Sequence, residues 1–92
     1  MGRPRVKGIS HFFREKRTAA GLTQFESATN LGHSTAQYIS NLERGLCEPS
    51  LEMALKLCDM YSVPKRELYD LLLEVYEQEL KKRLFGKATK KR

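Results

Sequence analysis

Apolar residues recur along this chain at helical spacing, and no stretch alternates between apolar and polar residues long enough to suggest a strand. The periodic segments and the residues that interrupt them predict five helices, over about 10–20, 23–31, 34–44, 50–62 and 64–85. The connections between them are short, which is typical of a small all-α domain. In the fourth segment the predicted inward face is Leu51, Ala54, Leu55 and Cys58.

Capping patterns support these boundaries. Thr23 and Glu26 form a T-x-x-E capping box at the start of the second helix, and Ser34 and Gln37 form an S-x-x-Q box at the start of the third. Glycines follow the first three segments at Gly21, Gly32 and Gly45. Val63-Pro64 separates the fourth helix from a long fifth one.

The second and third helices are predicted to form a helix-turn-helix. Only Gly32, His33 and Ser34 are left to connect them, so they must cross at a steep angle. Gly32 permits the tight backbone turn, and Ala28 is small enough for the third helix to pass close by. Ile39 and Leu42 supply the buried stripe of that third helix.

The opposite stripe of the third helix predicts a surface for DNA. It consists of Gln37, Ser40, Asn41 and Arg44, which contain no acid and no large apolar side chain. Glutamine and asparagine can form bidentate hydrogen bonds with adenine, and arginine binds guanine or phosphate. A solvated helix face would more often mix glutamate with lysine, so we expect this stripe to enter a major groove.

Charge is concentrated at the two ends of the 92-residue chain. The net charge is +6, of which residues 1–8 contribute +3 and residues 81–92 contribute +7, while the body between them is −4. We expect 1–8 to be a basic arm and 86–92 a basic, disordered tail that contact DNA phosphates. Arg3 and Arg5 are candidates for insertion into a minor groove. The alternative is that both ends only improve solubility.

The fifth helix, over 64–85, carries more apolar surface than one small core needs. Leu68, Leu71, Leu72 and Val75 can face the domain. A second, heptad-like stripe is predicted to form a homodimer interface; it contains Tyr69, Leu73, Tyr76, Leu80 and Leu84. The alternative is that these residues extend the core of a single subunit.

Several classes of protein are disfavoured. No set of residues with the spacing of a catalytic triad, a zinc site or a phosphate-binding loop is present, so we expect neither an enzyme nor a metal or other cofactor. Cys47 and Cys58 are interpreted as reduced thiols of a cytoplasmic protein, with a redox role for Cys47 as the alternative. No apolar run suggests a membrane span, and no signal-peptide pattern opens the chain.

A set of short motifs, in order, resembles the Cro/repressor-type (XRE-like) helix-turn-helix domain. The resemblance extends from Arg17 to Val63. Its matching pieces are R-x-x-x-G-L-T-Q at 17–24, Ala28, Leu31-Gly32, L-E-R-G at 42–45, P-S-L-E at 49–52 and L-K-L at 55–57. It implies a five-helix, lambda-repressor-like DNA-binding domain over 9–63, with an extended C-terminal helix.

The resemblance also implies roles for individual residues. Gln24 would cap the second helix against a phosphate and reach toward Gln37, and Arg17 would form an ion pair with Glu43. One residue more than usual lies between Gly32 and Glu43. The recognition helix is therefore expected to start at about residue 35, and the resemblance leaves this position undetermined by one residue.

Two other departures from the family pattern concern the second helix. Ser27 stands where leucine is usual, and Phe25 stands where an acid is usual. Phe25 would either fill the space that the smaller Ser27 leaves or remain exposed as a contact.

The expected function is that of a dimeric transcriptional regulator, a repressor rather than an activator, that binds a partly palindromic site in double-stranded DNA. The alternative is an antitoxin or another module that binds a protein partner through the long helix and tail. Non-specific coating of nucleic acid by the basic ends is a further alternative. The candidate DNA contacts are Gln24, Thr35, Ala36, Gln37, Ser40, Asn41, Arg44, Arg3 and Arg5.

Overall fold

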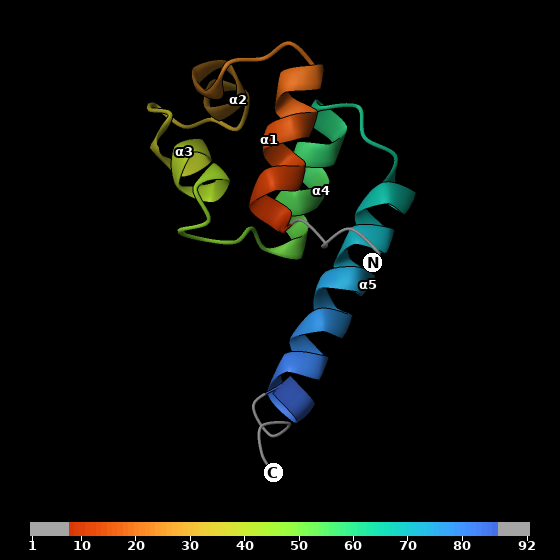
Figure 1. Cartoon of the computed structure of the whole chain (residues 1–92). Coiled ribbons are helices and arrows are strands. Elements are labelled where there is room, and N and C mark those ends of the chain that lie inside the picture. Colours follow the sequence, from red (N-terminus) through yellow and green to blue (C-terminus); the bar gives the residue numbers. More distant parts are fainter. Residues whose placement is uncertain (1–7, 87–92) are drawn as a thin grey trace.

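The computed structural model describes residues 8–86, and every regular element within them is helical. The helices are α1 (Ile9–Ala19), α2 (Gln24–Asn30), α3 (Gln37–Glu43), α4 (Leu51–Met60) and α5 (Lys65–Lys81), and a π-helical turn, η1, covers Lys82–Gly86. Figure 1 shows α2 and α3 on one side of α1 and α4, with α5 on the other side. The predicted all-α architecture is confirmed.

The start of α2 follows the predicted capping box. Thr23 Oγ1 accepts a hydrogen bond from the Glu26 amide at 3.0 Å, and the Thr23 amide donates to Glu26 Oε1 at 2.8 Å. Each side chain therefore satisfies a backbone donor that the first turn leaves without a partner. Ser50 acts similarly at α4, where its Oγ accepts from the Met53 amide at 3.1 Å.

The end of α2 is closed by a Schellman motif. The Gly32 amide donates to the Thr29 carbonyl at 2.8 Å, and the His33 amide donates to the Ala28 carbonyl at 2.9 Å. This arrangement requires a residue with positive φ, and Gly32 has a φ of 88°. Residues Gly32 and His33 therefore belong to the end of α2 and not to the start of α3.

The second predicted capping box, formed by Ser34 and Gln37, is wrong. Helix α3 begins at Gln37 with Ala36 as its N-cap, and no side chain caps it. The Gln37 amide instead donates to Thr35 Oγ1 at 3.3 Å. Because residues up to His33 close α2, residues 34–36 remain as a loop, and α3 starts at Gln37, later than the expected position 35.

The core lies among α1, α2, α3, α4 and the first turns of α5. Its largest completely buried apolar side chains are Phe13, Ile39, Leu42, Leu57 and Cys58. The expected inward face of α4 is partly wrong, because Leu51 is exposed and Leu57 is buried. Ala54, Leu57 and Cys58, spaced i, i+3 and i+4, form the stripe that points inward, and Leu51 lies in the open first turn.

Helix α5 leaves the body of the domain about halfway along its length (Figure 1). Leu68 is buried and Leu71, Leu72 and Val75 are partly buried, whereas every described residue from 76 onward is exposed. The helix expected over 64–85 is α-helical only to Lys81 and ends in the wider π-helical turn. No helix in residues 8–86 combines the length and the apolar character needed to cross a membrane.

Candidate nucleic-acid interface

Helix α3 is held by contacts with both α1 and α2. Ile39 and Leu42 point from α3 into the core and are completely or almost completely buried, and Ala28 of α2 is buried beside them. Because these residues occupy one side of α3, its polar residues lie on the other side. Of these polar residues, Gln37 and Arg44 are exposed and Ser40 and Asn41 are half-buried.

Three of these side chains are hydrogen-bonded in a row. Gln37 Nε2 donates to Asn41 Oδ1 at 2.9 Å, and Arg44 Nη2 donates to the same oxygen at 3.0 Å. The residues are spaced i, i+4 and i+7, so the bonds run along one face of the helix. Thr35 is exposed and Ala36 is half-buried in the loop immediately before this row.

An ion pair fixes the C-terminal end of α3 to α1. Arg17 Nε lies 2.6 Å from Glu43 Oε2, Arg17 Nη2 donates to Glu43 Oε1 at 3.0 Å, and Arg17 Nη1 donates to the Leu22 carbonyl at 2.7 Å. The side chains of Arg17 and Glu43 are 15% and 3% exposed. The hydrogen bond to Glu43 raises the pKa of Arg17, and burial opposes that increase. The ion pair that the family resemblance implies is present, and its two nitrogen–oxygen contacts make it bidentate.

Gln24 joins the same network. Its Nε2 donates to Glu43 Oε1 at 2.9 Å, so the side chain points to Glu43 and not toward Gln37 as expected. The almost fully buried carboxylate is a stronger acceptor than an amide and needs donors from the protein, since little water reaches it. Glu43 thereby links the first residue of α2 with α1 and α3.

The unusual residues of α2 have separate explanations. Ser27 is completely buried and accepts a hydrogen bond from the Tyr61 hydroxyl at 3.0 Å. The phenol ring of Tyr61 therefore occupies space beside the small Ser27, and Phe25 does not, because it is 58% exposed. Burial raises the pKa of Tyr61, and the hydrogen bond with Ser27 acts against this. A serine at an apolar helix position was a signal for such a buried partner, although the partner's identity was not predictable.

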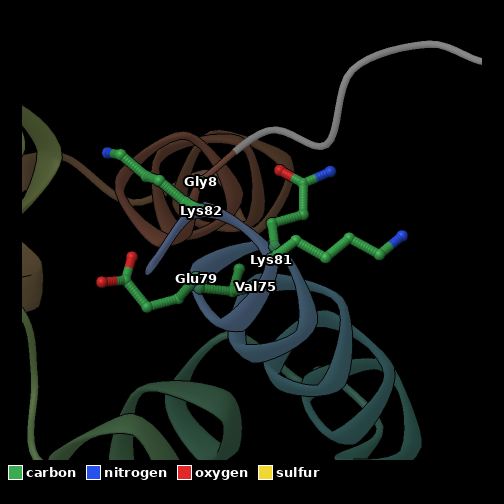
Figure 2. Close-up of a pocket in the computed structure, with 6 residues that line it drawn as sticks. Gly8, Val75, Glu79, Lys81 and Lys82 are labelled. Carbon is green, nitrogen blue, oxygen red and sulfur yellow. The ribbon is translucent and has the colours of Figure 1, made fainter. Parts of the chain in front are cut away.

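The first described residue lies beside the last turns of α5. Gly8, Val75, Glu79, Lys81 and Lys82 line one open pocket, and Figure 2 shows the side chains of Lys81 and Lys82 extending away from each other. Gly8 therefore lies near the basic residues Lys81 and Lys82 at the end of α5. Arg3 and Arg5, the candidate minor-groove residues, lie outside the described residues.

The proposed dimer stripe is an exposed row that runs along α5 and continues into η1. Tyr69, Leu73, Tyr76, Leu80 and Leu84 are between 39 and 63% exposed. Charged pairs border the row, among them Arg66 with Asp70 at 3.2 Å and Lys81 with Glu77 at 3.3 Å. The row is not part of the subunit's own core, in contrast to the alternative interpretation of these residues.

The described residues contain no group of His, Cys, Asp and Glu side chains able to hold a metal ion. Cys47 is half-buried and Cys58 is buried, and both are free thiols. Burial raises the pKa of the Cys58 thiol, which disfavours the reactive thiolate.

Comparison with known families identifies this arrangement. A family model described as helix-turn-helix, HTH_3, matches residues 13–68, which include α1 from Phe13 onward, all of α2 to α4 and the start of α5. No curated protein and no solved structure matches the chain. The chain therefore belongs to the HTH_3 helix-turn-helix family, and it is a DNA-binding transcription regulator of the XRE type.

Proposed function

We propose that the protein is a cytoplasmic transcriptional repressor that binds a partly palindromic operator as a homodimer. The observation that carries this proposal is the polar face of α3. Gln37, Asn41 and Arg44 lie on it in one row. The acid of this helix, Glu43, is turned inward and neutralised by Arg17. A face with amide and guanidinium groups and no exposed carboxylate suits the major groove, where base edges and phosphates surround an inserted helix.

The exposed stripe on α5 supports dimerisation. Complete burial of a fully exposed large apolar side chain is worth about 1.5–3 kcal/mol. The side chains of this stripe are 39–63% exposed, so each would gain roughly half of that before the costs of association are subtracted. A second copy of the chain presents an identical stripe, and two-fold pairing makes such surfaces self-complementary. Two related recognition helices would then contact two half-sites about 34 Å apart, which requires a palindromic sequence. We expect repression because a bound dimer would block access to the DNA that it covers.

Selection of bound duplexes from a random DNA pool tests sequence-specific binding. We expect an enriched sequence with two related half-sites. Gln37→Ala should lower affinity for it by about 1–3 kcal/mol, with little change on random DNA. Equal affinity for selected and random duplexes would contradict the proposal and would favour non-specific coating by the basic ends.

Sedimentation at micromolar concentration tests the dimer. Tyr76→Asp with Leu80→Asp should give a folded monomer that binds a half-site weakly and loses cooperative binding to the full site. Gln78→Asp is the control, because it adds a negative charge to the same part of α5 on the side that faces Gly8. A wild-type protein that is monomeric at this concentration would contradict the dimer.

The same exposed stripe also favours the second candidate, a protein-interaction module such as an antitoxin. In that case α5 would be covered by a different protein. A monomeric chain that forms a stoichiometric complex with a small partner through Tyr76 and Leu80 would support this function over the homodimer.

A further inference from the structure

Asn41 lies at the centre of the row on α3 and receives two hydrogen bonds on one atom. Gln37 Nε2 and Arg44 Nη2 both donate to Asn41 Oδ1, at 2.9 and 3.0 Å. A carbonyl oxygen has two lone pairs, so both acceptor positions of Asn41 are occupied. The inference that follows rests on the proposed function, since it concerns how this row would contact DNA.

The orientation of both amides follows from Arg44. A guanidinium group has only donors, so the Asn41 atom that faces it must be the oxygen. The Gln37 atom that approaches this same oxygen must then be the nitrogen. Arg44 therefore determines how the amides of Asn41 and Gln37 are turned.

The atoms that remain differ between the two amides. Gln37 keeps its Oε1 and one Nε2 hydrogen, which are the acceptor and the donor that a bidentate contact with adenine N6 and N7 needs. Asn41 keeps only its Nδ2 donors, which make no hydrogen bond within residues 8–86. Asn41 cannot form the bidentate adenine contact that its residue type suggests while both bonds persist.

We propose that Asn41 is a positioning residue that holds Gln37 for the recognition of an adenine, with Arg44 as the lock that fixes the Asn41 amide. Gln37 is exposed at the first turn of α3, and without this support its side chain would rotate freely. The bond from Gln37 to Asn41 lowers the conformational cost of binding because the amide is already aligned. Sequence preference at one base pair then depends on three residues, of which only Gln37 contacts the base.

The test compares base preferences in duplexes selected from a random DNA pool by the wild-type chain and its variants. Wild type should prefer adenine at one position by roughly 5- to 150-fold, the range of a good bidentate contact. Gln37→Ala should abolish this preference. Asn41→Ala should strongly reduce the adenine preference at the same position. At positions where Gln37→Ala leaves the base preference unchanged, Asn41→Ala should leave it unchanged as well.

Asn41→Asp separates positioning from direct contact. Its carboxylate can accept from both Gln37 and Arg44 but has no N–H to donate to a base. The adenine preference should therefore persist in Asn41→Asp, even if the added negative charge lowers affinity for all sequences equally. Ser40→Ala is the matched control on the same face, because Ser40 makes no side-chain bond to Gln37, and it should leave this preference unchanged.

Two results would overturn the inference. If Asn41→Ala and Asn41→Asp both remove a preference at a second base pair that Gln37→Ala retains, Asn41 itself contacts a base. If wild type selects a clear sequence and Asn41→Ala keeps the full adenine preference, Gln37 needs no support. Failure of the wild-type chain to select any sequence would instead remove the proposed function, and the inference with it. Unfolding curves of each variant in urea ensure that a reduced preference is measured on folded protein.

Discussion

Replacement of Arg17 by methionine should destabilise the fold far more than the removal of a surface ion pair. Methionine retains much of the aliphatic length of arginine, so the change mainly removes the guanidinium. It leaves the Glu43 carboxylate, which is 3% exposed, with Gln24 as its remaining side-chain donor. Breaking one partner out of a buried pair typically costs about 3–5 kcal/mol.

The size of this effect is large for a chain of 92 residues. Domains of this length have a free energy of unfolding of about 5–14 kcal/mol, and each kcal/mol of destabilisation lowers Tm by about 4–8 °C. Glu43→Gln should cost less, about 1.5–3 kcal/mol, the usual contribution of a hydrogen bond to a charged group. It preserves an acceptor for Gln24, and Arg17, which is 15% exposed, keeps its bond to the Leu22 carbonyl.

Urea unfolding followed by circular dichroism measures these costs. Lys16→Met is the matched control on α1, because Lys16 pairs with Glu67 at 2.7 Å but the side chains are 31% and 47% exposed. Removal of this pair should cost no more than about 1 kcal/mol. In the Glu43→Gln background, Arg17→Met should become much less costly, since the uncompensated charge is gone. An Arg17→Met cost below that of Lys16→Met, or one that is the same in both backgrounds, would refute the reasoning.

Three further predictions concern other parts of the chain. The pKa of Tyr61 is raised above its ordinary value of about 10, so the neutral phenol stabilises the folded state below about pH 10, and this stability is lost as the pH rises above about 10. The unfolding free energy of Tyr61→Phe should therefore fall less steeply above about pH 10 than that of the wild type. Parallel curves for the two proteins would contradict this. Ser62 has a φ of 58°, so Ser62→Gly should raise the unfolding free energy measured in urea by up to about 1 kcal/mol while Ser62→Ala should not; equal values would show that the turn is unstrained. Deletion of residues 1–7 or 87–92 should weaken binding to all DNA sequences and reduce the salt dependence by about one unit for each phosphate that is no longer neutralised, and an unchanged slope in both deletions would assign the ends to solubility.

Local patterns in the sequence predicted much of the fold because they depend on neighbouring residues. The Thr23–Glu26 box and the glycine-terminated helices involve hydrogen bonds between residues a few positions apart. The Ser34–Gln37 pattern matched a capping box equally well, but the prediction was wrong. The amides of Gly32 and His33 bond to the carbonyls of α2 in the Schellman motif, so α3 cannot start immediately after them. A pattern at a helix start is thus informative only after the preceding helix has been correctly ended.

For contacts between residues far apart in the sequence, the sequence indicated that a side chain would have an unusual contact but not which residue would be its partner. Ser27 at an apolar position indicated something unusual, yet its partner Tyr61 is 34 residues away, and Phe25 was an equally reasonable choice. The expected approach of Gln24 to Gln37 failed for a related reason. The Glu43 carboxylate is buried by α1 and competes successfully for the amide of Gln24, which no local pattern around Gln24 indicates.

Local sequence patterns were also insufficient for the chemistry of the α3 face. Residue types give the hydrogen-bond donors and acceptors that are present, but not which of them remain free to contact DNA. Glu43 belongs to the helix that would enter the groove, and only its contacts with Arg17 and Gln24 remove its charge from the exposed face. Asn41 has the side chain that recognises adenine, yet both lone pairs of its oxygen are used within the helix. Under the proposed role of Asn41, base recognition depends on hydrogen bonds that the polar residues of α3 make with one another before DNA is bound. Variants that alter these bonds should then change sequence preference without removing any residue that touches a base.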